Sequence, residues 1–166
     1  GGSTEVPRND PTAYPILRSS SVRPFAVDFS DVRYLEPQQS VREANYLQDG
    51  DLLFTLLSGS LEYVGNSAVV RSLGGARVQY PDRLFRCRLE DPREAAFIEI
   101  AFAGPGVRSQ IEAASRSAAG HQRISISDLK GFEFARPPLE EQAEIVVRVS
   151  GLLSSTEALM ARIDRA

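Results

Sequence analysis

The sequence of 166 residues contains no tryptophan and only one cysteine, one histidine and one methionine. It has no run of about 18 apolar residues, and its start, Gly1 to Thr4, is neither basic nor apolar, so we expect no transmembrane span and no signal peptide. A single Cys87 cannot form an internal disulfide, and one cysteine with one histidine cannot form a soft-ligand zinc cluster. These absences predict a soluble, cytoplasmic protein without a metal site.

Lysine is almost absent too, because Lys130 is the one lysine among 19 basic residues and the other 18 are arginine. Two explanations remain open. Genomic base composition can favour arginine codons, or the protein requires planar, bidentate donors that suit phosphate and guanine. With 42% hydrophobic and 25% charged residues, the chain has the material for one folded domain, or for one domain with an appendage.

The charge is unevenly distributed. A net charge of −3 argues against nucleic-acid binding, since a basic face is the usual footprint of such proteins. However, residues 1–66 carry a net −4, residues 67–138 a net +3 and residues 139–166 a net −2. Between positions 71 and 88, five arginines are opposed only by Asp82. This run is either a solvated face or, if it points one way, a patch for phosphates.

Apolar and alternating segments predict a mixed α+β domain that is mostly β, with short helices. We expect a first apolar segment at 14–18 and short strands at 26–29, 32–35, 52–57, 67–71, 76–80, 84–89, 124–126 and 132–134. Helices are expected from Asp91, which caps the first, to Gly104, from Val107 to Ser117, and as one turn at 127–131. Loops are expected at 19–21, 59–65 and 119–123, and residues 1–13 are expected to be a flexible or added N-terminus.

The segment 84–89 alternates in polarity, which places Phe85, Cys87 and Leu89 on one side of the expected strand. Arg86 and Arg88 then face the other side. Cys87 is therefore expected to be a small core residue, with a reactive thiol as the weaker alternative.

Pro137-Pro138 forms the clearest boundary of the chain and separates an expected domain at 14–138 from a long helix at 139–166. The helix carries apolar residues at alternating steps of four and three, which is a heptad seam of about three repeats. The seam consists of Ile145, Val149, Leu152, Leu159 and Ile163, with Thr156 filling the gap. Such a helix either projects to pair with a partner helix, which its length favours, or packs back on its own domain.

Searches for catalytic patterns give little. The chain lacks a phosphate-binding glycine loop and a Gly-x-Ser-x-Gly elbow. Asp128 and Lys130 with the distant Asp82 form only a weak match to a metal-dependent nuclease. His121, in a Gly-His-Gln-Arg segment, has no orienting carboxylate at a recognisable spacing, so no catalytic residues and no bound cofactor are predicted.

One stretch, residues 120–146, carries a family resemblance. It consists of Gly-His-Gln-Arg, an Ile-Ser segment, a Leu-containing turn, Phe-Glu-Phe, and then Pro-Pro-Leu-Glu-Glu-Gln at 137–142 before the long helix. Upstream lie a Gly-Asp-apolar segment at 50–54 and a glycine loop with a following strand at 64–70. This order resembles the target recognition domain of the specificity subunit of type I restriction–modification systems. The Trp-led opening segment of many such domains is missing here.

The resemblance implies a mixed α/β domain that recognises one half of a bipartite double-stranded DNA site, followed by a spacer helix. It implies that the helix sets the distance to a second recognition domain, or to a second copy. The same helix would dock methyltransferase subunits, which carry S-adenosylmethionine, while a restriction subunit cleaves. The chain itself would be non-catalytic, and either half a subunit, a fragment or a dimerising half-length form.

Within this resemblance, side chains on loops supply the candidates for base contacts, and arginines on strands supply those for phosphate contacts. The base candidates are Gln122 and Arg123, followed by Ser19, Ser20, Arg108, Gln110 and Arg116; the phosphate candidates are Arg77, Arg86 and Arg88.

Two alternatives stay open. The chain could be a protein–protein adaptor whose helix from Leu139 pairs with a partner while its arginines only solvate the surface. It could also be the recognition end of a single-chain restriction–methylation enzyme.

Overall fold

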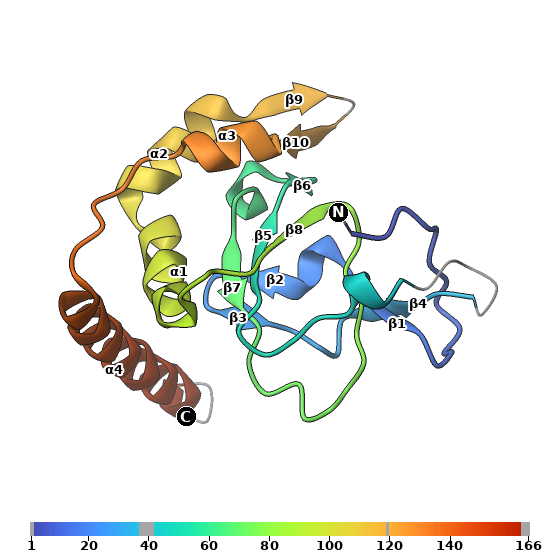
Figure 1. The fold of residues 1–166 in the computed structure, drawn as a ribbon, viewed down its shortest axis with the longest axis horizontal. Coiled ribbons are helices and arrows are strands. Elements are labelled where there is room, and N and C mark those ends of the chain that lie inside the picture. Colours follow the sequence, from blue (N-terminus) through green and yellow to red (C-terminus); the bar gives the residue numbers. More distant parts are fainter. Residues whose placement is uncertain (1, 37–41, 119, 164–166) are drawn as a thin grey trace.

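The computed structural model describes residues 2–36, 42–118 and 120–163. A central antiparallel sheet separates a helical side from a lobe of small β-hairpins (Figure 1). The fold class is therefore the predicted one, a mostly β, mixed α+β domain with short helices that is followed by one long helix. Among the described residues, no helix is long and apolar enough to cross a membrane.

Within the described ranges, ten strands form four small sheets. The central sheet has the order β7-β5-β8, a second sheet has the order β6-β10-β9, and the pairs β1-β4 and β2-β3 are two-stranded. All of these pairings are antiparallel. The strands are β1 Pro15–Leu17, β2 Val22–Arg23, β3 Ala26–Val27, β4 Val32–Tyr34, β5 Leu52–Thr55, β6 Leu57–Ser58, β7 Ser67–Val69, β8 Leu84–Cys87, β9 Arg116–Ala118 and β10 His121–Arg123.

Strand β5 is buried on both faces, which explains its unbroken apolar sequence. Leu52 and Phe54 face one hydrophobic cluster, with Val69 of β7 and residues of the helices. Leu53, from the alternate position, faces a second cluster with Ala68 and Leu84. Because side chains alternate across a strand, one short segment supplies both cores. The predicted strand at 52–57 is present as two strands, β5 and β6, divided at Leu56. The predicted burial holds for β5, whereas Leu56 and Leu57 are half-buried.

The helices cover the first of these clusters. A 3-10 turn, Pro92–Glu94, leads into α1, Ala95–Ala103, and the Asp91 side chain accepts a hydrogen bond from Arg93 N at 3.0 Å, as predicted for the cap. Helix α2, Pro105–Ala114, and the short α3, Ile126–Gly131, complete the layer. Ile111 of α2 is fully buried there, and Phe102 of α1 packs edge-on against Phe54 with ring centroids 4.7 Å apart.

The alternation in β8 is also confirmed. Phe85, Cys87 and Leu89 pack against the first cluster, and Arg86 and Arg88 turn to the other side. Burial raises the pKa of the Cys87 thiol, with a smaller effect from the nearby Asp51 charge. A raised pKa lowers the thiolate fraction at neutral pH, so the structure favours the core role over a reactive thiol.

The structure corrects the predicted order at residues 116–126. The expected loop at 119–123 contains β10, and the expected strand at 124–126 is instead buried Ile124 and the start of α3; residue 119 lies outside the described residues. The polar segment His121–Arg123 is a strand because β6 and β9 pair with it on both sides. Its sequence has no alternation of apolar and polar residues that would predict a strand. Helix α3 begins early because Ser125 and Asp128 form a capping box.

Four other predictions need correction. Residues 76–80 form no continuous strand, because Gln79 bridges two different partners, Ile16 and Tyr46. Residues 132–134 form no strand, and Phe132 and Phe134 pack their rings on Phe102. Helix α2 begins at Pro105, since proline suits the first helical position, and it ends at Ala114 before β9. The expected loop Ser19–Ser21 is a 3-10 turn.

The N-terminal segment, expected to be loosely ordered, is held by backbone hydrogen bonds. Ser3 N donates to Tyr80 O at 2.9 Å, Asp82 N donates to Ser3 O at 2.8 Å, and Arg8 and Tyr34 exchange two bonds. Gly2 passes so close to Pro81 that a Cβ atom would lie 2.3 Å from its carbonyl oxygen. The segment therefore contributes to the surface around Pro81.

The long helix α4, Leu139–Ile163, confirms the predicted helix, and residues 164–166 lie outside the described residues. Its first half packs beside α1 (Figure 1), where Ile145 and Val149 are half-buried. Further along, Leu152, Leu159 and Ile163 are 69%, 56% and 59% exposed. The helix thus packs back on its own domain at its beginning and presents the later part of its apolar seam to solvent.

Gly65 should tolerate no side chain. Its φ of +76° is in the left-handed region, and a Cβ atom would lie 2.5 Å from Cδ1 of the buried Ile111. We expect Gly65→Ala to lower the free energy of unfolding by about 2–4 kcal/mol, from backbone strain and overpacking, measured by urea denaturation. In a double-mutant cycle with Ile111→Ala the two losses should be less than additive, since the clashing atoms are gone. Gly106→Ala, in α2 with open space around it, should be neutral or stabilising.

The capping box of α3 predicts a pH-dependent stability. Backbone and side-chain hydrogen bonds from Ser125, with a smaller effect from Arg116, hold the pKa of Asp128 below its usual value of 3.8. A lowered pKa adds stability that is present above the unfolded-state pKa and is lost as the pH falls through the folded-state value. Asp128→Asn should therefore lower Tm at pH 7, and the difference from the wild type should shrink below about pH 4. A Tm difference that stays constant down to pH 2 would contradict this account.

Candidate nucleic-acid interface

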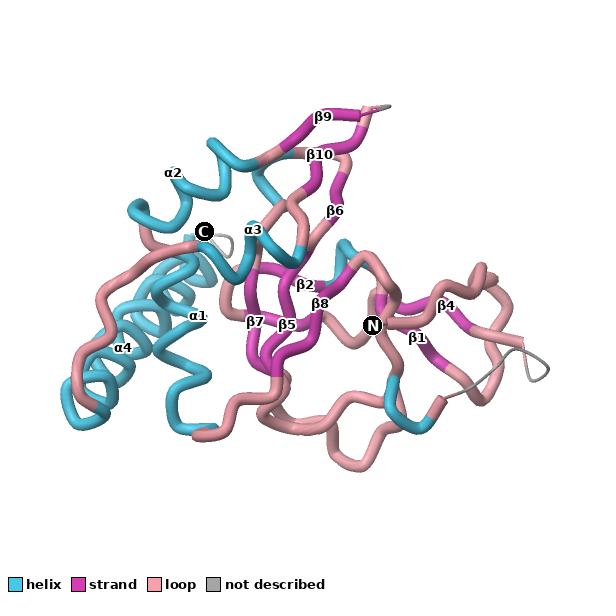
Figure 2. Tube along the Cα trace, turned by 45° about the horizontal axis from the view of Figure 1, so that its top comes forward, coloured by secondary structure: helices cyan, strands magenta, loops and turns pink. Residues whose placement is uncertain are grey.

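Two adjacent hollows form a groove on the surface beside β6 and β10. The first, of about 520 Å³, lies among the N-terminal segment, the 3-10 turn Ser19–Ser21 and β4; the second, of about 590 Å³, lies between β6 and the start of α3. Asp82 and Arg83 line both. In Figure 2 the β6-β10-β9 sheet and the β1-β4 pair stand on either side of the N-terminal end. We call this surface the cationic groove, after its arginines Arg18, Arg23, Arg33, Arg83 and Arg123.

Backbone hydrogen bonds bring three distant segments together at the centre of the cationic groove. Leu56 N donates to Arg83 O at 2.9 Å, and Ile124 N donates to Leu56 O at 3.0 Å. In the pairing of β10 with β6, Arg123 lies opposite Leu57. The residue between β5 and β6 therefore joins the turn before β8 to the end of β10, and this places Arg83 and Arg123 along one groove.

The groove carries more positive than negative charge. Its five arginines are accompanied by two acidic residues, Glu5 and Asp82. Arg18 forms an ion pair with Asp31 at 3.0 Å, and the guanidinium of Arg23 lies 4.6 Å from the ring centroid of Tyr63. Within the described part of the chain, Arg33, Arg83 and Arg123 have no ion pair or side-chain hydrogen bond. Three guanidinium groups are thus available to an anionic ligand.

Some of the residues predicted from sequence meet in this groove. Ser19 and Ser20, from the 3-10 turn, and Arg123, from β10, line it. Gln122 is adjacent to Arg123 on β10 and therefore points to the opposite face of the strand, where its Oε1 accepts a hydrogen bond from Ser115 Oγ at 3.4 Å. Arg123 and Arg116 lie directly across from each other on β10 and β9.

The other base-contact candidates make bonds within the domain. Arg108 donates to Val64 O at 2.7 Å and Leu61 O at 3.0 Å, so it ties α2 to the glycine loop. Gln110 donates to Glu133 O and accepts from Glu133 N, at 2.7 and 2.9 Å. Arg116 pairs with Asp128 at 3.1 Å. The structure does not bring these three side chains into the cationic groove.

The phosphate candidates are also paired. Arg77 binds Glu43 at 2.7 Å, Arg88 binds Asp51 at 2.6 Å, and both carboxylates raise the pKa of their arginine through these hydrogen bonds. Arg86 donates to Ala44 O at 2.8 Å and Tyr46 O at 3.2 Å. These arginines hold the 43–46 segment against the buried Asp51, so the basic run at 71–88 does not form a single patch.

The groove also contains four arginines that were not selected from the sequence as individual contact residues, namely Arg18, Arg23, Arg33 and Arg83. Arg83 belongs to the basic run at 71–88, but its neighbours turn elsewhere. No local spacing connects the others, because the N-terminal segment and the β1-β4 pairing bring them together. A sequence signal for this site would require knowledge of strand pairing.

No group of three or more His, Cys, Asp or Glu side chains among the described residues could hold a metal ion. Asp128, which the weak nuclease pattern used, is engaged in the cap of α3. The guanidinium and hydroxyl groups that line the cationic groove can bind an anion.

Comparisons with known proteins identify relatives of the chain. No protein-family model matches the chain. The chain is 38% identical over 165 residues, or 99% of its length, to the type I restriction enzyme EcoKI specificity subunit of Escherichia coli strain K12. It is 30% identical over 122 residues to the StySPI specificity subunit of Salmonella potsdam.

The aligned regions cover 36% of the first relative and 26% of the second, so the chain spans about a third of the length of the curated relatives it matches. The match to the first relative extends over nearly the whole chain and includes the segments that carry the groove and α4. The chain is therefore a homologue of the specificity subunits of type I restriction enzymes.

Proposed function

We propose that this chain is a DNA target recognition domain of a type I specificity subunit, and that it recognises one half of a bipartite site without catalysing a reaction. The observation that carries the proposal is the 38% identity over 99% of the chain to a specificity subunit. The cationic groove supplies the physical support, since it offers unpaired arginines on a surface with hydroxyl groups around it.

Phosphate binding follows from the charge of the groove. Guanidinium groups bind phosphate oxygens in a bidentate manner, and Arg33, Arg83 and Arg123 need not break an existing ion pair to do so. Ser19 and Ser20 add hydroxyl groups of the kind that contact phosphates and bases. Arg77, Arg86 and Arg88 would have to leave Glu43 and Asp51 or the segment at 44–46 first, so we place them outside the DNA contact.

Base recognition is proposed for β10. The major groove of DNA admits a β-ribbon, and β9 and β10 form an antiparallel pair, with β6 on the other edge of β10, at one end of the molecule (Figure 2). Arginine pairs with guanine and glutamine with adenine through two hydrogen bonds each. Arg123 and Gln122 project from opposite faces of β10. One of the two side chains can therefore contact a base while the other contacts the DNA backbone or a second base.

The proposed partners follow from the family resemblance and from α4. A second recognition domain, or a second copy, would pair with the exposed seam of α4, and methyltransferase subunits carrying S-adenosylmethionine would dock on the same helix. A restriction subunit would join this complex in the cytoplasm. Exposed Leu152, Leu159 and Ile163 support a partner on this face, because they lie in succession along one helix.

The adaptor function is the second candidate. It is favoured by the same exposed seam, which needs a partner whether or not the domain binds DNA. Binding to DNA distinguishes the two functions.

The DNA proposal predicts salt-dependent binding through the groove. The chain should bind random double-stranded DNA at low salt, and Arg33→Ala, Arg83→Ala and Arg123→Ala should each reduce the slope of log K against log salt by about one. Fluorescence anisotropy across a salt series measures this slope. Gln122→Ala should leave the slope unchanged, because the neutral amide releases no counterions.

The matched control is Arg148→Ala, which removes an exposed arginine of α4 that pairs with Glu144 far along the chain from the groove. It should leave the slope unchanged. Absence of binding at low salt would favour the adaptor, and equal effects of all four arginine variants would show that total charge, rather than the cationic groove, binds DNA.

The helix proposal predicts that the seam can be removed without loss of the fold. Leu152→Ser/Leu159→Ser/Ile163→Ser should leave Tm within about 2 °C of the wild type, because all three side chains are mostly exposed. It should abolish co-purification with a co-expressed methyltransferase subunit of the same system. The control Val6→Ser/Leu61→Ser changes exposed apolar residues elsewhere and should retain the partner. Equal retention by both variants would contradict the proposed interface.

A further inference from the structure

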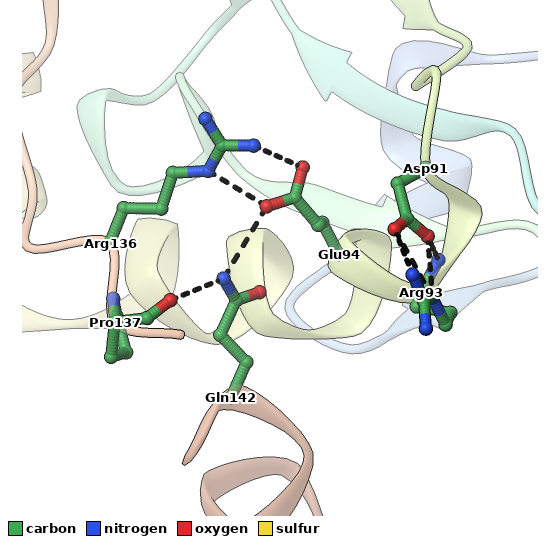
Figure 3. A network of polar contacts seen from close by, with 6 residues as sticks. All are labelled: Asp91, Arg93, Glu94, Arg136, Pro137 and Gln142. Atoms are coloured by element: carbon green, nitrogen blue, oxygen red, sulfur yellow. Dashed lines mark hydrogen bonds and ion pairs between the residues drawn. The ribbon is translucent and has the colours of Figure 1, made fainter. Parts of the chain in front are cut away.

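A buried carboxylate lies where the domain meets α4. Glu94, the last residue of the 3-10 turn before α1, has a side chain that is 10% exposed. Its two oxygens accept hydrogen bonds from Nε and Nη2 of Arg136, each at 2.7 Å (Figure 3). Its Oε1 also accepts a longer bond of 3.4 Å from Gln142 Nε2. Glu94 therefore contacts the chain both before and after Pro137-Pro138.

The partners of Glu94 bracket the turn into the helix. Gln142 is 3% exposed, and its Nε2 also donates to Pro137 O at 2.8 Å. Its backbone N–H donates to Pro138 O at 3.0 Å, which is the first hydrogen bond of the helix. Two consecutive prolines fix φ and lack N–H groups, so the connection from Arg136 to Leu139 has little freedom. Because this connection is short and stiff, the contacts of Glu94 also restrict the orientation of α4.

The other contact between α4 and the domain is less complementary. A hollow of about 220 Å³ lies between α1 and α4. Apolar side chains of both helices, such as Ile100 and Val149, line it together with the ion pair of Arg71 and Glu99. Helix surfaces that leave such a space between them constrain the angle between two helices weakly, because packing specifies geometry only when the side chains interlock. A bidentate arginine–carboxylate pair fixes both distance and orientation.

We propose that Glu94 is a positioning residue that sets the direction in which α4 leaves the domain, by binding Arg136 and Gln142 on the two sides of Pro137-Pro138. We call the three residues the Glu94 clamp. A fixed direction of α4 would hold two half-site domains at a set separation. This role of the clamp rests on the proposed function. The clamp itself does not, since it is defined by contacts within this chain.

Distance measurements between two spin labels test the clamp. In a Cys87→Ala background, labels at Lys130→Cys on α3 and Ser155→Cys on α4 occupy exposed positions on the two sides of the turn. The protein with the clamp intact should give one narrow distance distribution. Glu94→Ala and Arg136→Ala should each broaden it or shift its mean by several ångströms. The double variant should match Glu94→Ala, because the Arg136–Glu94 pair is already absent there.

Two further variants keep the test decisive. Arg136→Lys keeps the charge but loses the two-point contact; since this side chain is 69% exposed, the variant should fold and still broaden the distribution, even if Glu94→Ala does not fold. Glu144→Gln removes an exposed ion pair of α4 with Arg148 and should change nothing. A residue that only stabilises the fold would lower Tm while the folded molecules kept a narrow distribution.

An unchanged distribution in the folded clamp variants would overturn the proposal, as would equal broadening in Glu144→Gln. The measurement contains no DNA. Failure of the clamp is therefore distinguishable from failure of the proposed function, which appears as an absence of salt-dependent DNA binding.

Discussion

Strand β5 is the constraint on which the rest of the molecule depends. Its alternate side chains enter two hydrophobic clusters, so the helical layer and the hairpin lobe are both anchored to the same few residues. The residue that follows, Leu56, extends this order to the surface by bonding to Arg83 and Ile124. The cationic groove is therefore positioned by the core, because the backbone that carries two of its arginines continues the pairing of the central sheet.

The parts of the fold that sequence could predict are those with strong local signals. Three such signals depend on neighbouring residues alone: the apolar run at 52–57, the Asp91 cap and the long helix after Pro137-Pro138. Strand β10 could not be predicted in the same way, since His121–Arg123 is polar and becomes a strand through pairing with β6 and β9. At 76–80 the error was the opposite, because a strand was predicted and none forms. The alternating residues of this segment bridge separate partners and make no continuous ladder.

The residues of the candidate site also divide into those that sequence could predict and those that depend on strand pairing. Sequence selected Ser19, Ser20 and Arg123 by residue type and expected loop position, and all three line the groove. It could not select Arg33, whose place depends on the pairing of β4 with β1. Residue type also could not show that Arg88 neutralises the buried Asp51, where an unpaired carboxylate would be costly. Most arginines among the described residues thus make ion pairs or hydrogen bonds within the chain, and a minority remain available for a ligand.

The excess charge of the groove is small in a chain of net charge −3, so long-range attraction to DNA is weak and affinity must come from close contacts. Under the proposed function, a single half-site then binds weakly, and useful affinity requires two domains on one DNA molecule. The gain from linking two weak sites depends on how well the connection matches their separation, and it is lost when the geometry is wrong. The proposed function therefore requires a rigid attachment of α4 to the domain, because a flexible linker would spread the second site over many positions. The short connection at Glu94, stiffened by two prolines, meets this requirement.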